Sequence, residues 1–480
     1  LLWGRRTAQA LIALAAAAGG LWAAALLVIH TYGGGAPLVY AMGGWVAPFG
    51  IVYVADLLGA TMALMGQGVM FFGLVYALGC RDDCARYPAF LPLFLTLSGS
   101  LSGCMLTGDI FNFFVMVELL VISGTVLTAI SDDRMGVESA FKYFYMSLFA
   151  GILLLFACGS LYAAYGTLNI ADLAARIRAD QSTPLLLPLA TVCLTVVFLV
   201  KAAVFPFHFW QPDFHSVSPT PVSAMLSSVV VKVGVYGLLR LCTLLLPPGV
   251  EAIRVLLIVL GICGVFFGGL NAIGTHHAKR LLAYSTIAQI GFMMVAIGWG
   301  SPPALAAVIV FALNHALVKS AMLMLAGYAA SRAPVKSASF AVVGGLGRQM
   351  PLAGALFLIG AMALAGLPPT NGFVSKLSVF RGGVAGGHWL EIGLLAAGSV
   401  VSLIYASRAF QRIWFDPPGG ESPAEHAKVK PYGDRLLAPA CLIVACLALG
   451  LWAEPALELA RRNAAWMLEP ARYIAAVLKT

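Results

Sequence analysis

Charged residues are scarce in this sequence of 480 residues and make up only 10% of it. Hydrophobic residues make up 61%, whereas ordinary soluble proteins are about 25% charged and about 45–50% apolar. This composition excludes a soluble globular protein. It indicates an integral membrane protein that crosses the bilayer many times, and its 51 glycines suit close contacts between membrane helices.

The sequence also lacks the motifs of nucleotide, metal and redox chemistry. It has no dinucleotide-binding fingerprint, no phosphate-binding loop and no cysteine set spaced for an iron–sulfur cluster. Of its nine cysteines, only Cys80 and Cys84 form a pair near a loop, and one CxxxC pair alone is a weak metal signal. We therefore expect no cofactor, no metal and no catalytic site in this chain. The net charge of +9 is attributed to loops and not to nucleic-acid binding.

Apolar segments of about 20 residues are long enough to cross a bilayer as helices. Thirteen such segments are visible, and the chain starts with Leu1 and not with Met, so we expect a missing first helix and 14 spans in all. The tail at 455–480 mixes arginines with apolar residues and is predicted to be an amphipathic surface helix. The predicted spans are 7–29, 51–79, 88–106, 109–130, 138–166, 184–209, 220–244, 251–274, 280–300, 303–331, 350–384 (interrupted), 389–415 and 434–454.

Basic residues concentrate in alternate loops, and such loops face the cytoplasm in membrane proteins. The opposite loops hold little beyond Arg176, Arg178 and Arg381 before the tail. We expect a multi-pass protein of the cell inner membrane; with the missing helix added, both full-length termini lie outside. The basic residues predicted to be cytoplasmic are Arg5, Arg6, Arg81, Arg86, Arg134, Lys279, Arg280, Arg332, Lys336, Arg348, Arg412, Lys428 and Lys430.

Two loops are long and polar. The loop at 167–183 is predicted to lie outside and to contain a short helix, and the loop at 416–432 is predicted to be cytoplasmic. Neither loop is long enough to form a soluble catalytic domain.

Five ionisable residues lie deep inside apolar segments, where a charge costs at least about 2.5–3.5 kcal/mol and marks a functional site by default. The lysines outnumber the one clear glutamate, so pairing does not neutralise them all. Burial and a nearby carboxylate act on a lysine in opposite directions, so lysines of this kind can exchange protons near neutral pH. The set predicts a proton relay, although any single lysine could also serve in an ion pair that only holds helices together. Its members are Glu118, Lys201, Lys232, Lys319 and Lys376.

Four further residues are secondary relay candidates. His315 lies four residues before Lys319 and therefore on the same face of a helix. Asp109 lies near a helix end, and Lys142 lies near a helix start, from which it could reach the membrane interface. His208 follows Lys201 in the same predicted span.

Proline interrupts two predicted spans. Pro206 follows Lys201, and Pro368 and Pro369 precede Lys376. Proline removes a backbone donor and clashes with the preceding turn, and a broken membrane helix is tolerated only where protein or water satisfies the freed backbone. Two breaks five spans apart, each beside a lysine, indicate two five-helix repeats, which are inverted because each has an odd number of helices. The predicted divisions are N-terminal helices at 1–87, a first repeat at 88–244, a second repeat at 245–415, and a loop, last helix and tail at 416–480.

Seven stretches match a known family in order: YAMGGWVAPFGIVYVAD, TGDIFNFFVMVEL, GTLNIADLA, VKAAVFPFHFWQPDFHSVSPTPVSAMLSSVVVKVGVYGLLR, KRLLAYSTIAQIGFM, NHALVKSAMLMLAG and GLPPTNGFVSKLSVF. The chain resembles the antiporter-like subunits shared by respiratory complex I, membrane-bound hydrogenases and multisubunit Mrp cation/proton antiporters. The opening GGWxAPFGI looks most like the D-type subunit of the Mrp antiporter. The resemblance spans residues 40 to about 385 and implies 14 helices and partner subunits in a hetero-oligomeric membrane complex.

The resemblance also implies roles for the deep charges. Glu118 would pair with Lys201, Lys232 would be the bridging lysine, and Lys376 would be the terminal one. His315 and Lys319 match the stretch that links the bridging lysine to the terminal one. A paired Lys201 would keep its proton, and a separated Lys201 would release it toward Lys232.

The sequence therefore predicts a proton-translocating subunit of an Mrp-type Na⁺/H⁺ antiporter. The first alternative is a pumping subunit of a redox-driven complex, such as complex I, a membrane-bound hydrogenase or formate hydrogenlyase. The second is a membrane scaffold with vestigial lysines, and the third is a single-chain carrier. The partner chains distinguish the antiporter from the redox pump, and lysine substitutions distinguish either from a scaffold.

Overall fold

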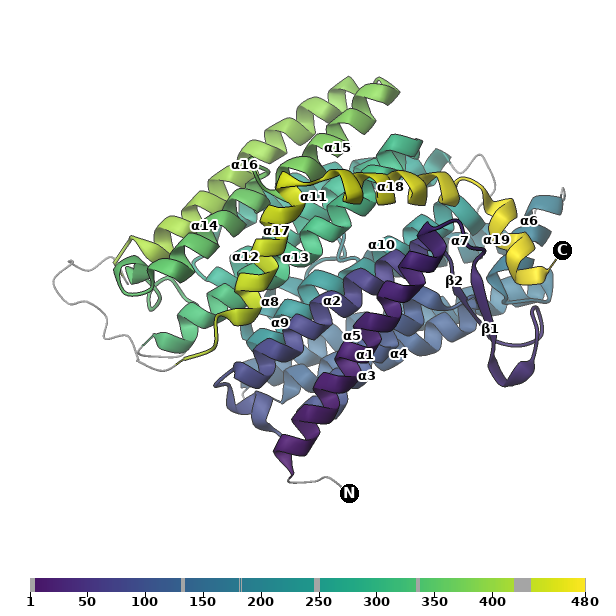
Figure 1. The fold of residues 1–480 in the computed structure, drawn as a ribbon. Coiled ribbons are helices and arrows are strands. Elements are labelled where there is room, and N and C mark those ends of the chain that lie inside the picture. Colours follow the sequence, from purple (N-terminus) through teal and green to yellow (C-terminus); the bar gives the residue numbers. More distant parts are fainter. Residues whose placement is uncertain are drawn as a thin grey trace.

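The computed structural model describes residues 5–130, 134–180, 182, 184–245, 251–333, 337–417 and 433–479. Long helices run back and forth between two ends of the molecule (Figure 1). We call the end with the two-stranded sheet the hairpin end, and the opposite end, which holds a cavity beside Asp434, the cavity end.

The bounds of the elements are as follows. The strands are β1 (Leu38–Ala41) and β2 (Val52–Ala55), and the helices are α1 (Arg6–Tyr32), α2 (Leu57–Gly79), α3 (Phe90–Leu106), α4 (Ile110–Ala129), α5 (Arg134–Tyr165), α6 (Ile170–Ala179), α7 (Leu186–Lys201), α8 (Trp210–Val217), α9 (Thr220–Met225), α10 (Val231–Arg240), α11 (Glu251–Gly274), α12 (Ala278–Trp299), α13 (Pro302–Arg332), α14 (Pro351–Ala365), α15 (Asn371–Gly386), α16 (Trp389–Trp414), α17 (Leu437–Leu451), α18 (Glu454–Met467) and α19 (Pro470–Leu478). Two π-helical segments, η3 (Leu226–Val230) and η4 (Leu241–Leu245), flank α10, and short 3₁₀ helices form η1 (Met42–Gly44), η2 (Asp83–Arg86) and η5 (Leu346–Arg348).

The all-α polytopic membrane fold predicted from the sequence is confirmed, since every predicted span contains helix. Among the described residues, nine helices are long and apolar enough to cross a membrane, and α3, α7 and α14 are shorter apolar helices. The bent pair of α17 and α18 makes ten if it counts as one span. The total of 13 visible spans, or 14 with a missing helix, stays a prediction.

Both predicted helix breaks are present. The helix α7 ends at Lys201 and α8 begins only at Trp210, so the predicted helix to residue 209 was too long. After α14, the chain turns through Gly366, whose φ of +83° lies in the left-handed region that glycine adopts without a steric penalty. Figure 1 shows α14 beginning at the cavity end, whereas α7 begins at the hairpin end beside α6. The two broken helices therefore run in opposite directions, as inverted repeats require.

The hairpin that names the hairpin end was not predicted. The sequence interpretation placed 51–79 in one helix, but Val52–Ala55 pairs antiparallel with Leu38–Ala41. Alternating valine and tyrosine favour a strand. Asp56 then starts α2, because its side chain accepts a hydrogen bond of 2.9 Å from the backbone N–H of Gly59.

Two predictions for the polar connections can be checked at the hairpin end. The short helix expected in 167–183 is α6, and the Asn169 side chain caps its first turn. The tail was predicted as one surface helix, but it forms two, because the second begins at Pro470 and proline interrupts a continuing helix. The first of the two, α18, turns 80° away from α17 and crosses the hairpin end (Figure 1), and its position on the membrane surface stays a prediction.

Basic residues of the predicted cytoplasmic set gather at the cavity end. There Arg6 donates a 3.0 Å hydrogen bond to the carbonyl of Ala85, and Arg332 donates one of 3.1 Å to the carbonyl of Asp434. Arg134 and Lys279 line the cavity itself. The remaining members Lys336, Lys428 and Lys430, with most of the 416–432 loop, lie outside the described residues.

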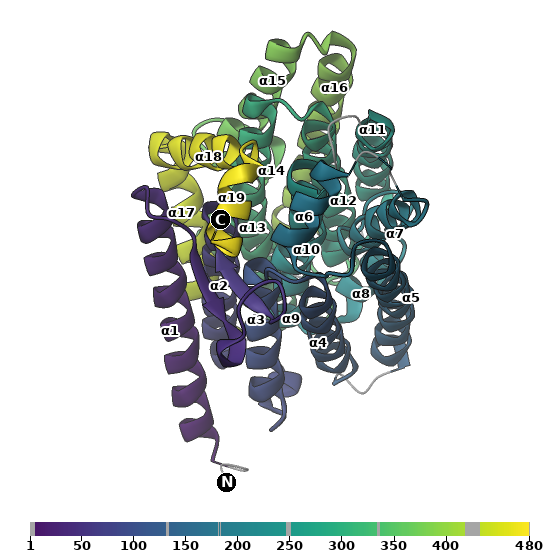
Figure 2. The same ribbon diagram turned by 90° about the vertical axis from the view of Figure 1, so that its right-hand side faces the viewer.

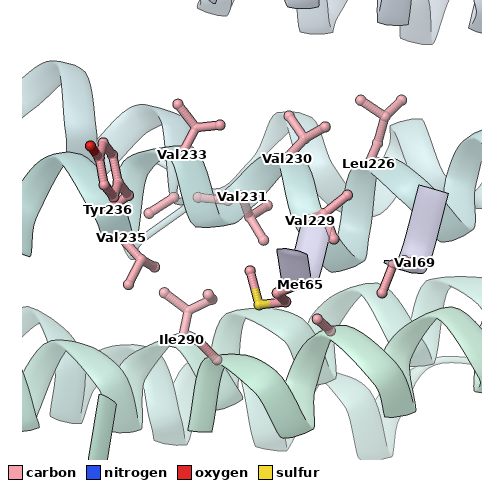
Figure 3. Packing of buried hydrophobic residues seen from close by; sticks show 14 of the residues in the cluster. Met65, Val69, Leu226, Val229, Val230, Val231, Val233, Val235, Tyr236 and Ile290 are labelled. Atoms are coloured by element: carbon pink, nitrogen blue, oxygen red, sulfur yellow. The ribbon is translucent and has the colours of Figure 1, made fainter. Parts of the chain in front are cut away.

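The core is centred on the segment from α9 through η4. All of its apolar window is buried, and Figure 3 shows its valine and leucine side chains beside Met65 and Val69 of α2 and Ile290 of α12. This packing places Lys232, the second residue of α10, in the centre of the molecule with no exposed surface.

Candidate functional site: a buried lysine axis

Lys201 is the last residue of α7, directly before the first break. Its side chain is buried, and its Nζ donates a hydrogen bond of 3.4 Å to the carbonyl oxygen of Ser147 on α5. The helix stops directly after Lys201, and the chain leaves it through Ala203, which has a left-handed φ of 52°. The lysine therefore ends a helix inside the protein with its amine directed to a neighbouring backbone group.

Glu118 lies on α4 close enough to Lys201 for the two charges to interact. Within the described part of the chain they do not form an ion pair, and the buried Glu118 Oε1 accepts no hydrogen bond. Gly151 of α5 leaves room for this carboxylate, because a Cβ at that position would overlap with Oε1. The predicted partners are therefore neighbours, but they are not in direct contact.

Lys232 and His315 are in direct contact. The Nζ of Lys232 donates to Nδ1 of His315 and to the carbonyl oxygen of Ser228, one turn earlier in the chain. Both side chains are buried, and Nε2 of His315 has no hydrogen-bond partner among the described residues. His315 therefore joins the axis as a direct partner of the central lysine.

Lys319 lies one turn after His315 on α13 and is fully buried. Its Nζ donates to the Leu282 carbonyl at 2.7 Å and to the hydroxyl of Ser285. Both partners belong to α12, so this lysine connects the two central helices of the second half.

Lys376 lies beside the second break, on α15. Its Nζ donates a 2.9 Å hydrogen bond to the carbonyl of Ala365, which ends α14, and lies 5.2 Å from the ring centre of Phe292. An ammonium over an aromatic face is attracted by the ring quadrupole. Lys376 is therefore held by neutral groups that the helix break and the ring supply.

Two buried neutral polar side chains near Lys376, those of Asn314 and Gln289, were not selected from the sequence. Asn314 donates to the hydroxyl of Ser375 at 3.1 Å, next to Lys376 in the chain. Gln289 donates to the hydroxyl of Tyr405 at 3.0 Å and to the carbonyl of Leu364 at 3.2 Å. The signal that could have found Asn314 is its place beside His315 in NHALVKS.

The structure places three secondary candidates away from this axis or at its margin. Asp109 caps the start of α4 by accepting from the Asn112 N–H at 2.8 Å. Lys142 is half exposed and pairs with Glu138 and Asp213 at 2.8 and 3.2 Å. His208 lies in the first break, packed against the ring of Phe267.

A cavity of about 570 Å³ opens at the cavity end. Lys279 on its wall is buried and donates to the Ser218 carbonyl at 3.1 Å. Burial and the charges of Lys279 and Arg280 lower the pKa of His277, also on the wall, to about 4, so its ring is neutral at pH 7. The charged and titratable residues of the lining are Asp82, Cys84, Arg134, His277, Lys279 and Asp434.

His215 directly precedes a residue of the cavity wall in the chain. It is fully buried in α8, directly before the wall residue Ser216, and it interacts electrostatically with both Lys279 and Lys319. Its Nδ1 lies 3.3 Å from the Ser223 hydroxyl, and its Nε2 has no hydrogen-bond partner in the described part of the chain. Among the described residues, no group of three or more histidine, cysteine or acidic side chains could hold a metal ion.

Fold and site together define a class of protein: a polytopic membrane protein with the four predicted relay lysines buried and two broken helices, each break beside one of these lysines. A protein-family model described as "NADH:quinone oxidoreductase/Mrp antiporter, TM" matches residues 107–404, which contain every member of the predicted relay. The chain belongs to this family.

Similar proteins come from both branches that the family description names. The chain is 30% identical to the D-type subunit of the Na⁺/H⁺ antiporter of Alkalihalophilus pseudofirmus, over 98% of this chain and 94% of that one. It is 33% identical to the N-type subunit of the NADH-quinone oxidoreductase of Desulforudis audaxviator, over 91% and 88% of the two chains.

Solved structures are similar over nearly the whole chain. A chain of the Mrp complex from Dietzia superposes with a TM-score of 0.89 at 25% identity, covering 99% of this chain and 96% of that one. A chain of an archaeal membrane-bound sulfane sulfur reductase superposes with a TM-score of 0.88 at 28% identity, covering 98% and 94%. Both are chains of membrane complexes.

Proposed function

We propose that this chain is the D-type, proton-translocating subunit of an Mrp-type Na⁺/H⁺ antiporter complex. The observation that carries the proposal is the set of four buried lysines, which are Lys201, Lys232 in contact with His315, Lys319 and Lys376. A scaffold has no need for four lysines that each cost several kcal/mol to bury. The similarity to the D-type antiporter protein over almost the full chain supports the choice of complex.

In this function Glu118 controls how strongly Lys201 holds its proton. When the two approach, the carboxylate stabilises the ammonium, and Lys201 keeps its proton. When they move further apart, Lys201 loses that stabilisation and passes its proton toward Lys232. The proton then moves by His315 and Lys319 to Lys376, with the first repeat at 88–244 and the second at 245–415 supplying one broken helix each.

The cavity is the entry for protons in this proposal. In this proposal protons pass from the cavity by His215, which directly precedes the wall residue Ser216 and whose Nε2 has no hydrogen-bond partner among the described residues. The concentration of basic residues at the cavity end supports a cytoplasmic location for that end. The membrane is then the cell inner membrane, and the hairpin, α6 and the tail lie outside.

The second candidate is a pumping subunit of a redox-driven complex. The 33% identity to a subunit of NADH-quinone oxidoreductase and the similarity to the sulfane sulfur reductase favour it. The same axis would then be driven by electron transfer on partner chains.

The partners decide between the two. The intact complex is purified in mild detergent, and its chains are identified by mass spectrometry. The antiporter predicts small hydrophobic partners with a second, larger antiporter-like chain and no metal-cluster proteins. Nickel–iron or iron–sulfur partners would refute the antiporter and establish the redox pump.

A further inference from the structure

A second buried charged cluster lies at the hairpin end, outside the lysine axis. Asp56 at the start of α2 and Arg240 at the end of α10 form an ion pair, and both side chains are buried. The two residues lie 184 positions apart in the chain. The relay described above uses neither of them.

The pair belongs to a continuous line of contacts. Arg240 Nε donates to the Tyr236 hydroxyl at 3.0 Å, and that hydroxyl donates to the Met105 carbonyl on α3 at 2.8 Å. On the other side, Trp466 Nε1 donates to Oδ2 of Asp56 at 3.0 Å. The guanidinium also lies 5.1 Å from the ring centres of both Tyr236 and Tyr473. Arg240 is therefore surrounded by a carboxylate, a hydroxyl and two aromatic rings.

Trp466 and Tyr473 belong to the tail, which reaches back across the hairpin end from the second half of the molecule. We call α18 and α19 the strap. Asn463 of the strap is fully buried and donates to the Thr61 hydroxyl at 3.1 Å, and Arg462 donates to the Tyr32 carbonyl at 3.0 Å. Figure 2 shows α18 and α19 on the same face as α6 and the hairpin. The strap thus covers the Asp56–Arg240 pair and ties it to α1 and α2.

The position of Arg240 relative to Lys232 suits a role in proton transport. It lies two helical turns beyond Lys232 on the same helix, between that lysine and the hairpin end. A guanidinium stays charged at all accessible pH values, so Arg240 does not pass protons on. It raises the energy of a proton that moves from Lys232 toward this surface. Two turns correspond to about 11 Å, and removing one positive charge at that separation changes the escape of a proton by about tenfold at an effective dielectric constant of 20. The carboxylate of Asp56 cancels part of this repulsion in the native pair.

We propose that Arg240, held by Asp56 and positioned by Trp466 and Tyr473 of the strap, is an electrostatic seal that stops protons on Lys232 from leaking to the hairpin end. The proposal rests on the proposed proton translocation. The strap, which begins in the second half and ends over the first, makes the seal depend on both halves being in place.

The test is proton leak through the intact complex in liposomes, under a pH gradient with no Na⁺ or K⁺ present, followed with a pH-sensitive dye. Arg240→Gln removes the charge and is expected to increase the leak about tenfold. Arg240→Lys keeps the charge and is expected to stay close to the wild-type leak. A packing defect without a seal would make both variants leak alike, and that result would overturn the proposal, as would an assembled Arg240→Gln complex that stays tight.

The strap is tested in the same assay. Trp466→Phe removes the hydrogen bond to Asp56 and is expected to leak more than Trp452→Phe, which changes an exposed tryptophan before α18. If Arg240→Gln blocks assembly, the comparison of Trp466→Phe with Trp452→Phe tests the proposal instead. Equal proton leak in these two variants would overturn it. A wild-type complex without cation-dependent proton exchange would refute the antiporter function while leaving the leak comparison readable.

Discussion

The two helix breaks hold their lysines in different ways. Lys201 at the first break has a carboxylate within electrostatic range, Glu118, which is separated from it. Lys376 at the second break is held by the Ala365 carbonyl and the face of Phe292, which are both neutral. The proton affinity of a lysine changes when a nearby carboxylate moves. The proton affinity of a lysine held by fixed neutral dipoles stays constant. In the proposed function, we therefore expect the first break to control proton release and the second to be a terminal proton site.

The largest expected effect that sharpens this comparison comes from Lys376→Arg. The substitution keeps the positive charge and its contacts with the carbonyl and ring, but a guanidinium does not release its proton. Cation-dependent proton exchange by the complex should fall below about 10% of wild type if Lys376 must deprotonate.

The matched control is Lys142→Arg, because Lys142 sits in a half-exposed ion-pair cluster with Glu138 and Asp213. That variant should transport at the wild-type rate. Full activity of Lys376→Arg would show that the second break needs a charge and not a proton.

A smaller effect is expected from Gly151→Ala at the first break. The new methyl group would overlap with Oε1 of Glu118 and force the carboxylate to move. Overpacking of this kind is expected to reduce exchange by about fivefold, measured with the same dye in liposomes. Gly159→Ala on the same helix faces open space and should have no effect. Equal rates in the two alanine variants would mean that the position of Glu118 does not control transport.

The buried lysines and Glu118 could be predicted from the sequence, whereas the Asp56–Arg240 pair could not. A charge in an apolar segment is visible without a structure, so Glu118, Lys201, Lys232, Lys319 and Lys376 could be selected from their surroundings. The prolines marked both breaks in the same way. The contact of Lys232 with His315 joins two helices that are distant in the chain, and no local pattern encodes it.

Other features could not be read from local pattern. The strand Val52–Ala55 is followed directly by an apolar helix. In the sequence prediction its alternating valine and tyrosine residues were therefore assigned to that helix. Asp56 and Arg240 lie at helix ends, where charged residues are common, and only the fold brings them together. The same holds for His215, whose neighbours Lys279 and Lys319 come from α12 and α13.

The most direct measurement of the central claim is proton transport by the intact complex carrying Glu118→Ala or Lys201→Ala. Assembly is checked by the subunit content of the purified complex, and exchange is followed with the pH-sensitive dye after addition of Na⁺. Both variants are expected to assemble completely and to lose transport. Normal transport in either variant would contradict the relay.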